Sequence, residues 1–226
     1  MRRAVAFAAL ALSIPAAGEE PTQELNLDWR RNPLSLKSYA SYYVSPVSMP
    51  AGAQPGDERL ARWAIESWDE ALGGLFCVRP EPATRARIRV YWGMTPEGLG
   101  RMQTIDVDGD RGGEVYLQLK GHLMAEAFRE DPLLRAVFVY RTLQHEVGHV
   151  LGLPHSLSLD DVMYFGGDVG GYYQRYRDRI NGVDEIRDVP GLSQEDLSRL
   201  RSLYPPNALW RESAERLEKA EDAEEK

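Results

Sequence analysis

Apolar residues of this chain repeat at helical spacing in two long stretches. The first runs from about Glu58 to Leu72, with Asp57 as its predicted cap, and Gly73-Gly74 ends it. The second begins at Asp131-Pro132, an aspartate cap followed by a first-turn proline, and ends at about Leu151. Because each stretch is apolar on one face, both helices are predicted to pack against a core. Their apolar faces comprise Leu60, Ala64, Trp68 and Ala71 in the first and Leu134, Phe138, Leu143 and Val147 in the second.

Shorter stretches, rich in aromatic or β-branched residues or alternating apolar and polar, predict β-strands. They are residues 38–44, 76–78, 86–92, 101–105 and 114–119. Clusters of Pro and Gly separate several of them and indicate loops. The interleaving of strands with two long helices places the chain in the mixed α+β class, without fixing the order of the strands.

The region after the second helix predicts two further helices. Residues 172–180 are dense in Tyr and Arg and suit a short helix, inside a long glycine-containing segment from Phe165 to Gly191. Ser193 to Asp196 resembles a capping box, which opens a helix that ends before Pro205. The charged tail at 207–226 has little to bury, so we expect a frayed helix or disorder, with a partner-binding role left open.

The N-terminal pattern is that of a secretory signal. Arg2 and Arg3 precede a short apolar run, and small residues at 16–18 form a cleavage site, so residues 1–18 are predicted to be a signal peptide. A buried N-terminal helix is the alternative. Residues 19–37 read as a polar arm, and 38–206 as the main folded domain. The expected location is secreted or periplasmic, and no other segment of the sequence is apolar enough to span a membrane.

Composition narrows the possible partners. The formal net charge is −8, so nucleic acid is not an expected partner. Cys77 is the only cysteine, which excludes a disulfide within the chain. It lies in an apolar, strand-like run, so we interpret it as a small buried residue. The alternative is a cysteine whose thiol binds a metal ion.

The strongest chemical signal is the stretch from His145 to His155. His145 and His149 are four residues apart, so a helix presents both on one face, where they can bind one zinc ion at about 2.0–2.1 Å. Glu146 can lie beside the metal's open position. Gly152 ends the helix, and His155 can supply the third ligand. Three protein ligands with one open position are typical of a catalytic zinc site. The alternative is an ordinary helix with surface histidines.

This stretch resembles the zinc signature of the metzincin metalloproteases, and Asp161-Val162-Met163-Tyr164 resembles their methionine turn. Ser156 after the third histidine and the seven residues between His155 and Met163 are similar to the matrixin branch, which includes shorter bacterial members. The resemblance implies a zincin-like fold: a twisted, mostly parallel sheet with long helices, one of which carries the zinc motif. Met163 would form a hydrophobic floor below the metal.

The resemblance implies a secreted zinc-dependent endopeptidase that acts on proteins or peptides. Zinc on His145, His149 and His155 would activate a water molecule, and Glu146 would act as the general base. The alternatives are a secreted zinc-holding domain that binds peptides without cutting them, and a hydrolase for other peptides such as those of a cell wall. The sequence does not identify an inhibitor.

Two further sites follow from the sequence and the resemblance together. Asp106, Asp108 and Asp110 alternate beside Gly109, a pattern that suits a calcium loop, although an ordinary solvated turn is the alternative. The strand at 114–119 is predicted, by the resemblance, to be the edge strand above the active-site cleft. Residues 113–119 would then hold an extended substrate through backbone hydrogen bonds.

Overall fold

A computed structural model describes residues 34, 40–47, 52–74, 76, 78–93, 100–119 and 125–204. The predicted signal peptide at 1–18, the charged tail at 207–226 and Cys77 lie outside the described residues, as does the predicted arm at 19–37 apart from Leu34.

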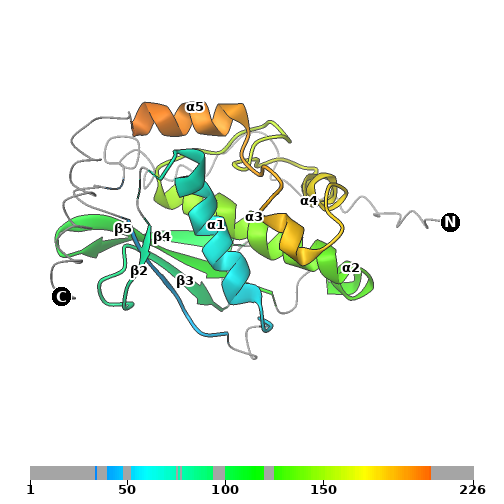
Figure 1. Cartoon of the computed structure of the whole chain (residues 1–226), viewed down its shortest axis with the longest axis horizontal. Helices are drawn as coiled ribbons and strands as arrows, with labels where there is room; N and C mark the ends of the chain where they lie inside the picture. The colour runs from blue at the N-terminus through cyan, green and yellow to red at the C-terminus, as the bar shows by residue number, and fades with distance from the viewer. Residues whose placement is uncertain are drawn as a thin grey trace, which may run out of the picture.

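A five-stranded sheet forms one layer of the described structure (Figure 1). Its order is β2-β1-β3-β5-β4, and every neighbouring pair is parallel except β4 and β5, which are antiparallel. The predicted α+β class with a mostly parallel sheet is therefore confirmed. The strands are β1 (Ser41–Val44), β2 (Arg79–Pro80), β3 (Ile88–Trp92), β4 (Gly100–Val107) and β5 (Asp110–Leu117).

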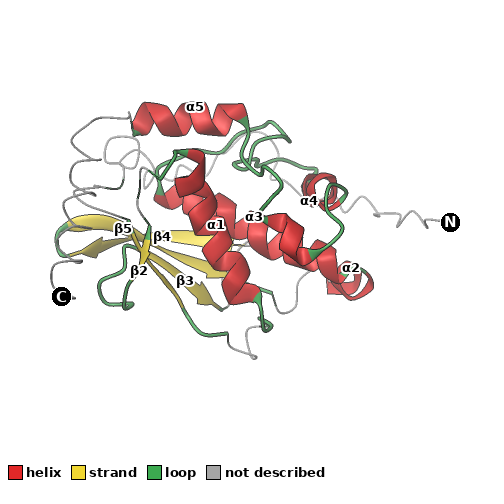
Figure 2. Ribbon diagram, viewed as in Figure 1, coloured by secondary structure: helices red, strands yellow, loops and turns green. Residues whose placement is uncertain are grey.

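The two long helices cover the same face of this sheet (Figure 2). They are α1 (Asp57–Ala71) and α3 (Pro132–Val150), and they also pack against each other. The shorter helices are α2 (Ala125–Glu130), α4 (Val169–Arg177), the 3₁₀ helix η3 (Val183–Ile186) and α5 (Gln194–Leu203). No helix in the described ranges combines the length and apolar character that a membrane crossing requires.

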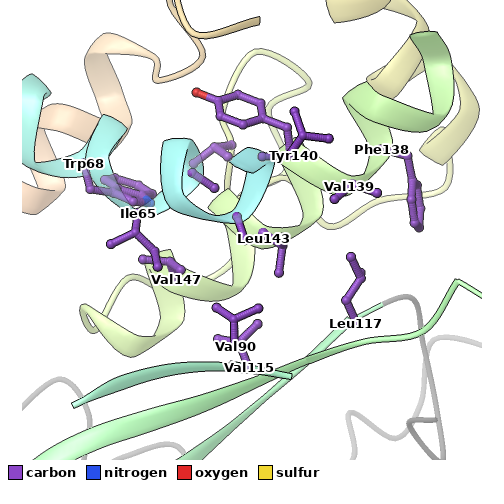
Figure 3. Packing of buried hydrophobic residues seen from close by; sticks show 14 of the residues in the cluster. Ile65, Trp68, Val90, Val115, Leu117, Phe138, Val139, Tyr140, Leu143 and Val147 are labelled. Carbon is purple, nitrogen blue, oxygen red and sulfur yellow. The ribbon is translucent and has the colours of Figure 1, made fainter. Parts of the chain in front are cut away.

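The main core lies between the sheet and the two long helices (Figure 3). Trp68 of α1 is fully enclosed, and its indole N–H donates to the Gln144 carbonyl of α3 at 3.0 Å. Val90 and Val115 reach up from neighbouring strands toward Val147 of α3 (Figure 3). Burial of each such side chain contributes about 1.5–3 kcal/mol, so this contact fixes α3 on the sheet.

Helix ends follow the predicted capping residues in two of three cases. The Asp131 carboxylate accepts hydrogen bonds from the first turn of α3, and Ser193 forms a complete capping box at the start of α5. The assignment of Asp57 as the cap of α1 is wrong, because Gly56 occupies that position. The Asp57 carboxylate instead accepts from Gln54 N–H and pairs with Arg135 of α3, with both guanidinium contacts at 2.8 Å.

The predicted strands need two corrections. Of the strand expected at 76–78, the described residues Phe76 and Val78 lie outside any strand, and the strand that pairs with β1 is Arg79–Pro80. The strand at 114–119 is not at the edge: β5 lies between β3 and β4, and the edge strand is β4. A two-residue turn at Asp108 and Gly109, both with positive φ, folds β4 back along β5 and covers it.

Tyr204 connects three distant parts of the chain. Its hydroxyl donates to the Leu151 carbonyl at the end of α3, at 2.8 Å, and accepts from Leu34 N–H at 2.9 Å. Its ring meets Phe76 edge to face, with 5.0 Å between the ring centroids. This buried residue therefore ties the described ends of the chain to the helix that carries the histidine motif.

Candidate metal centre and active site

The three motif histidines converge at the C-terminal end of α3. His145 and His149 lie in its last two turns, and Leu151 caps the helix. Gly152, with φ of 95°, reverses the chain, which brings His155 back to the same place. The His149 Nε2 atom lies 3.1 Å from the Nε2 atoms of both His145 and His155. The three rings therefore point their Nε2 atoms at one point.

Backbone carbonyls hold two of the rings in this orientation. His145 Nδ1 lies 2.8 Å from the Val162 carbonyl, and His149 Nδ1 lies 2.9 Å from the Leu153 carbonyl. A carbonyl can only accept, so Nδ1 carries the proton and Nε2 keeps its lone pair. Burial lowers the pKa of His145 and lowers that of His149 to about 4, which favours the neutral, metal-binding form.

This donor set fits a zinc ion. Two nitrogens bound tetrahedrally to one zinc at about 2.0–2.1 Å are separated by roughly 3.3 Å, close to the 3.1 Å observed. The candidate ligand atoms of His145, His149 and His155 all lie within 4.8 Å of one another. Elsewhere in the described part of the chain, no group of three His, Cys, Asp or Glu residues converges in this way.

Glu146 lies beside this cluster, under the start of the edge strand. Its side chain is 7% exposed and accepts a hydrogen bond from the Met102 backbone N–H of β4. Burial raises the pKa of Glu146 to about 8, against the opposing effect of that hydrogen bond. A Cβ atom on Gly100 would lie only 2.8 Å from Glu146 Oε1, so a side chain there would crowd the carboxylate. The sequence alone gave no sign of these contacts with β4.

Met163 forms a closed floor below α3. It is fully buried, and its sulfur packs so closely against Gly148 that an added Cβ atom would overlap it. The Met163 carbonyl accepts from Ser156 N–H at 2.7 Å, directly after His155. The turn and the third histidine are thus joined through the backbone.

Phe165 is an exposed aromatic residue at the cluster that the sequence did not single out. Its ring lies parallel to His155, with 4.4 Å between centroids and 16° between planes. Phe165 is 66% exposed, although its contact holds one face of the imidazole. The sequence feature that could have pointed to Phe165 is its position two residues after Met163, close to the turn below the metal ligands.

The three aspartates of the predicted calcium loop do not converge. They belong to the hairpin between β4 and β5, where Asp106 Oδ1 accepts from Gly109 N–H at 3.0 Å. Asp110 forms an ion pair with Arg87 at 2.6 Å. The calcium prediction therefore has no support from the described residues, and the solvated-turn alternative accounts for them.

Comparison with known proteins gives a distant match. No family model matches the sequence. The chain is 28% identical over 211 residues to a protein of Paracentrotus lividus named "Hatching enzyme". The alignment covers 87% of this chain and 30% of that protein, so the chain spans less than a third of the length of its curated relative.

Proposed function

We propose that the chain is a matrixin-like metzincin and acts as a zinc-dependent endopeptidase, a proposal supported by its distant similarity to the Paracentrotus lividus protein named "Hatching enzyme" and by its three converging histidines. The observation that carries this proposal is the convergence of three Nε2 atoms beside a buried glutamate. The metal ligands would be His145, His149 and His155, and Glu146 would be the catalytic residue. The substrates would be proteins or peptides. Export through the signal at 1–18 and the domain limits at 38–206 stay predictions from the sequence.

A zinc ion held by the three histidines supplies, when bound, Lewis-acid chemistry toward water and the scissile carbonyl. Glu146 accepts a proton from the attacking water and returns it to the leaving amine. Its buried position favours this role, because the raised pKa makes the carboxylate a stronger base than an exposed one. A nearby dication would lower that pKa toward the working range.

The edge strand β4 is the surface on which an extended peptide can be bound. It is antiparallel to β5 on one side, and its other side carries no strand among the described residues. Met102 of β4 donates to Glu146, so a peptide aligned along this edge would pass directly beside the base. We therefore transfer the substrate-facing role from residues 113–119 to β4.

Glu146→Gln tests the assignment of the base. The variant keeps the three histidines and nearly the same side-chain shape, so it should bind one zinc per chain while losing about 10²–10⁴-fold in peptide cleavage. Cleavage of a peptide library by zinc-loaded protein, with zinc content measured in parallel, gives both quantities. Glu130→Gln, an exposed change at the end of α2, is the matched control and should cleave normally.

Two outcomes would contradict the proposal. Full activity in Glu146→Gln would exclude this residue as the base. A wild-type protein that binds one zinc and cleaves nothing in the library would favour the peptide-binding alternative.

A further inference from the structure

An open cavity of about 400 Å³ lies between α4 and the loop that precedes α5. Sites for small molecules typically occupy roughly 300–1,000 Å³. Its walls come from α3, α4, Arg179, and residues 159–160 and 190–193. Neither Glu146 nor the histidine cluster lines it, so the cavity is separate from the candidate active site.

The cavity contains a buried arginine without an anionic partner. Arg141 is 4% exposed, and no carboxylate of the described residues forms an ion pair with it. Its Nη1 donates to Gln144 Oε1 at 2.7 Å and to the Gly191 carbonyl, both uncharged acceptors. Its Nε–H is buried and has no hydrogen-bond partner in the described structure. A buried charge in this condition is costly unless an anion accompanies it.

Two more arginines line the same cavity. The guanidinium carbons of Arg141 and Arg179 lie 5.1 and 5.6 Å from the centre of the same ring, that of Tyr176. Arg175 forms an ion pair with Asp160 at 3.5 Å, and both side chains are exposed. The cavity thus holds three cations and one anion in a chain whose net charge is −8. This local excess of positive charge attracts an anion.

We infer that this cavity binds a small organic carboxylate. Guanidinium groups bind carboxylates through paired N–H donors, and Arg141, Arg175 and Arg179 place three guanidinium groups in the wall of the cavity. Leu159, Leu192 and the ring of Tyr172 supply apolar walls for a hydrocarbon body. The inference does not depend on the proposed hydrolysis.

Tyr172 links the cavity to the metal centre. The Tyr172 hydroxyl donates to the Val162 carbonyl at 3.1 Å, and the same carbonyl accepts from His145. The Tyr172 ring lies 5.0 Å from the guanidinium carbon of Arg141. A carboxylate on Arg141 would therefore bind behind the turn that supports the first histidine.

Calorimetric titration of the zinc-loaded full chain with 3-phenylpropionate tests the site. We expect saturable one-to-one binding and none with the neutral isostere 3-phenylpropionamide. Arg179→Gln should weaken binding about tenfold, the loss expected for one charged contact. Arg201→Gln, an exposed change on α5, is the matched control and should bind as the wild type does. Arg141→Gln should abolish binding. If the Arg141→Gln protein does not fold, the result for Arg179→Gln still decides the test.

Carboxylates also bind zinc, so the titration is repeated with acetohydroxamate saturating the metal. Binding that persists with acetohydroxamate present and is weakened by Arg179→Gln supports a ligand site in the cavity. The inference would be overturned if the acid and the amide bound equally, if acetohydroxamate abolished binding, or if Arg179→Gln left binding unchanged. It would also be overturned if phenylpropionate did not bind at concentrations of tens of millimolar. N-acetyl-glutamate N-methylamide, which mimics a glutamate side chain of a peptide, serves as a second probe. If phenylpropionate binds more tightly, the ligand is a free acid. If the glutamate derivative binds more tightly, the ligand is an acidic side chain of a peptide.

Discussion

Gly148→Ala should loosen the floor of the metal centre. Gly148 lies inside α3, between the two metal-facing histidines of that helix, and it contacts the Met163 sulfur directly. A Cβ atom there would overlap that sulfur and would lie 3.1 Å from Cζ2 of Trp68. The indole is held by its hydrogen bond to Gln144, so the methionine has to move.

Two opposing effects determine the size of the change. Alanine favours an interior helical position over glycine by about 1 kcal/mol. Overpacking of a closed core costs about 1–3 kcal/mol, and the fully buried Met163 and Trp68 place this site at the upper end. The net loss is therefore about 1–2 kcal/mol, or a fall of about 2–8 °C in Tm for a chain of this size. Zinc affinity should fall about tenfold, since the Met163 carbonyl holds the backbone after His155.

Thermal unfolding and competition with a zinc chelator measure these two quantities. Gly182→Ala is the matched control, because its Cβ atom meets nothing within 4 Å and its backbone is extended, so Tm should barely change. Met163→Ala removes the overlapping atoms. The combined loss of stability in the double variant, Gly148→Ala with Met163→Ala, should therefore be at least about 1 kcal/mol smaller than the sum of the losses in the two single variants. A Gly148→Ala protein that is more stable than the wild type would refute the packing argument.

Three other changes have defined outcomes. Arg135→Met should cost about 3–5 kcal/mol in urea unfolding, because it leaves the buried Asp57 carboxylate unpaired, and a loss below 1 kcal/mol would contradict this. Ser193→Ala should cost about 1–2 kcal/mol by the same assay, since the hydroxyl caps α5 and donates to Asp161 at 2.7 Å. Burial raises the pKa of Glu66, so its ionised form opposes folding. Glu66→Gln should therefore raise the free energy of unfolding slightly at pH 7. Melting curves should show this gain disappear below pH 4.5, where Glu66 is protonated in both the folded and the unfolded wild type.

Local signals predicted the two long helices, α5 and the histidine geometry well, whereas α2 and η3 were not predicted. The ends of α3 depend on an aspartate cap and a glycine turn, both of which act within a few residues. The spacing of His145 and His149 fixes their shared face as soon as the helix forms. The capping box of α5 is equally local. These features need no knowledge of the rest of the fold.

The strand order could not be obtained in the same way. Pairing in a sheet joins segments far apart in the chain, and alternation specifies a face without specifying a neighbour. The missed signal was composition: β4 carries Arg101, Gln103, Thr104 and Asp106, polar residues that suit an edge, whereas β5 buries Val115 and Leu117. Arg141 was overlooked because its burial depends on α4 and the loop before α5, which only tertiary packing brings to it.

The Tyr204 hydroxyl has a consequence for biosynthesis. Its partner Leu34 lies 170 residues earlier, so this contact closes one of the longest loops of the chain. Whether it leaves the ribosome or an export channel, the chain emerges from its N-terminus, so the residues of the sheet and α3 are available before residue 204, and the Leu151 carbonyl at the end of α3 lacks its Tyr204 donor until then. The final turn that aims His149 and His155 should therefore become rigid as one of the last steps of folding, which would delay metal capture until the domain is nearly whole.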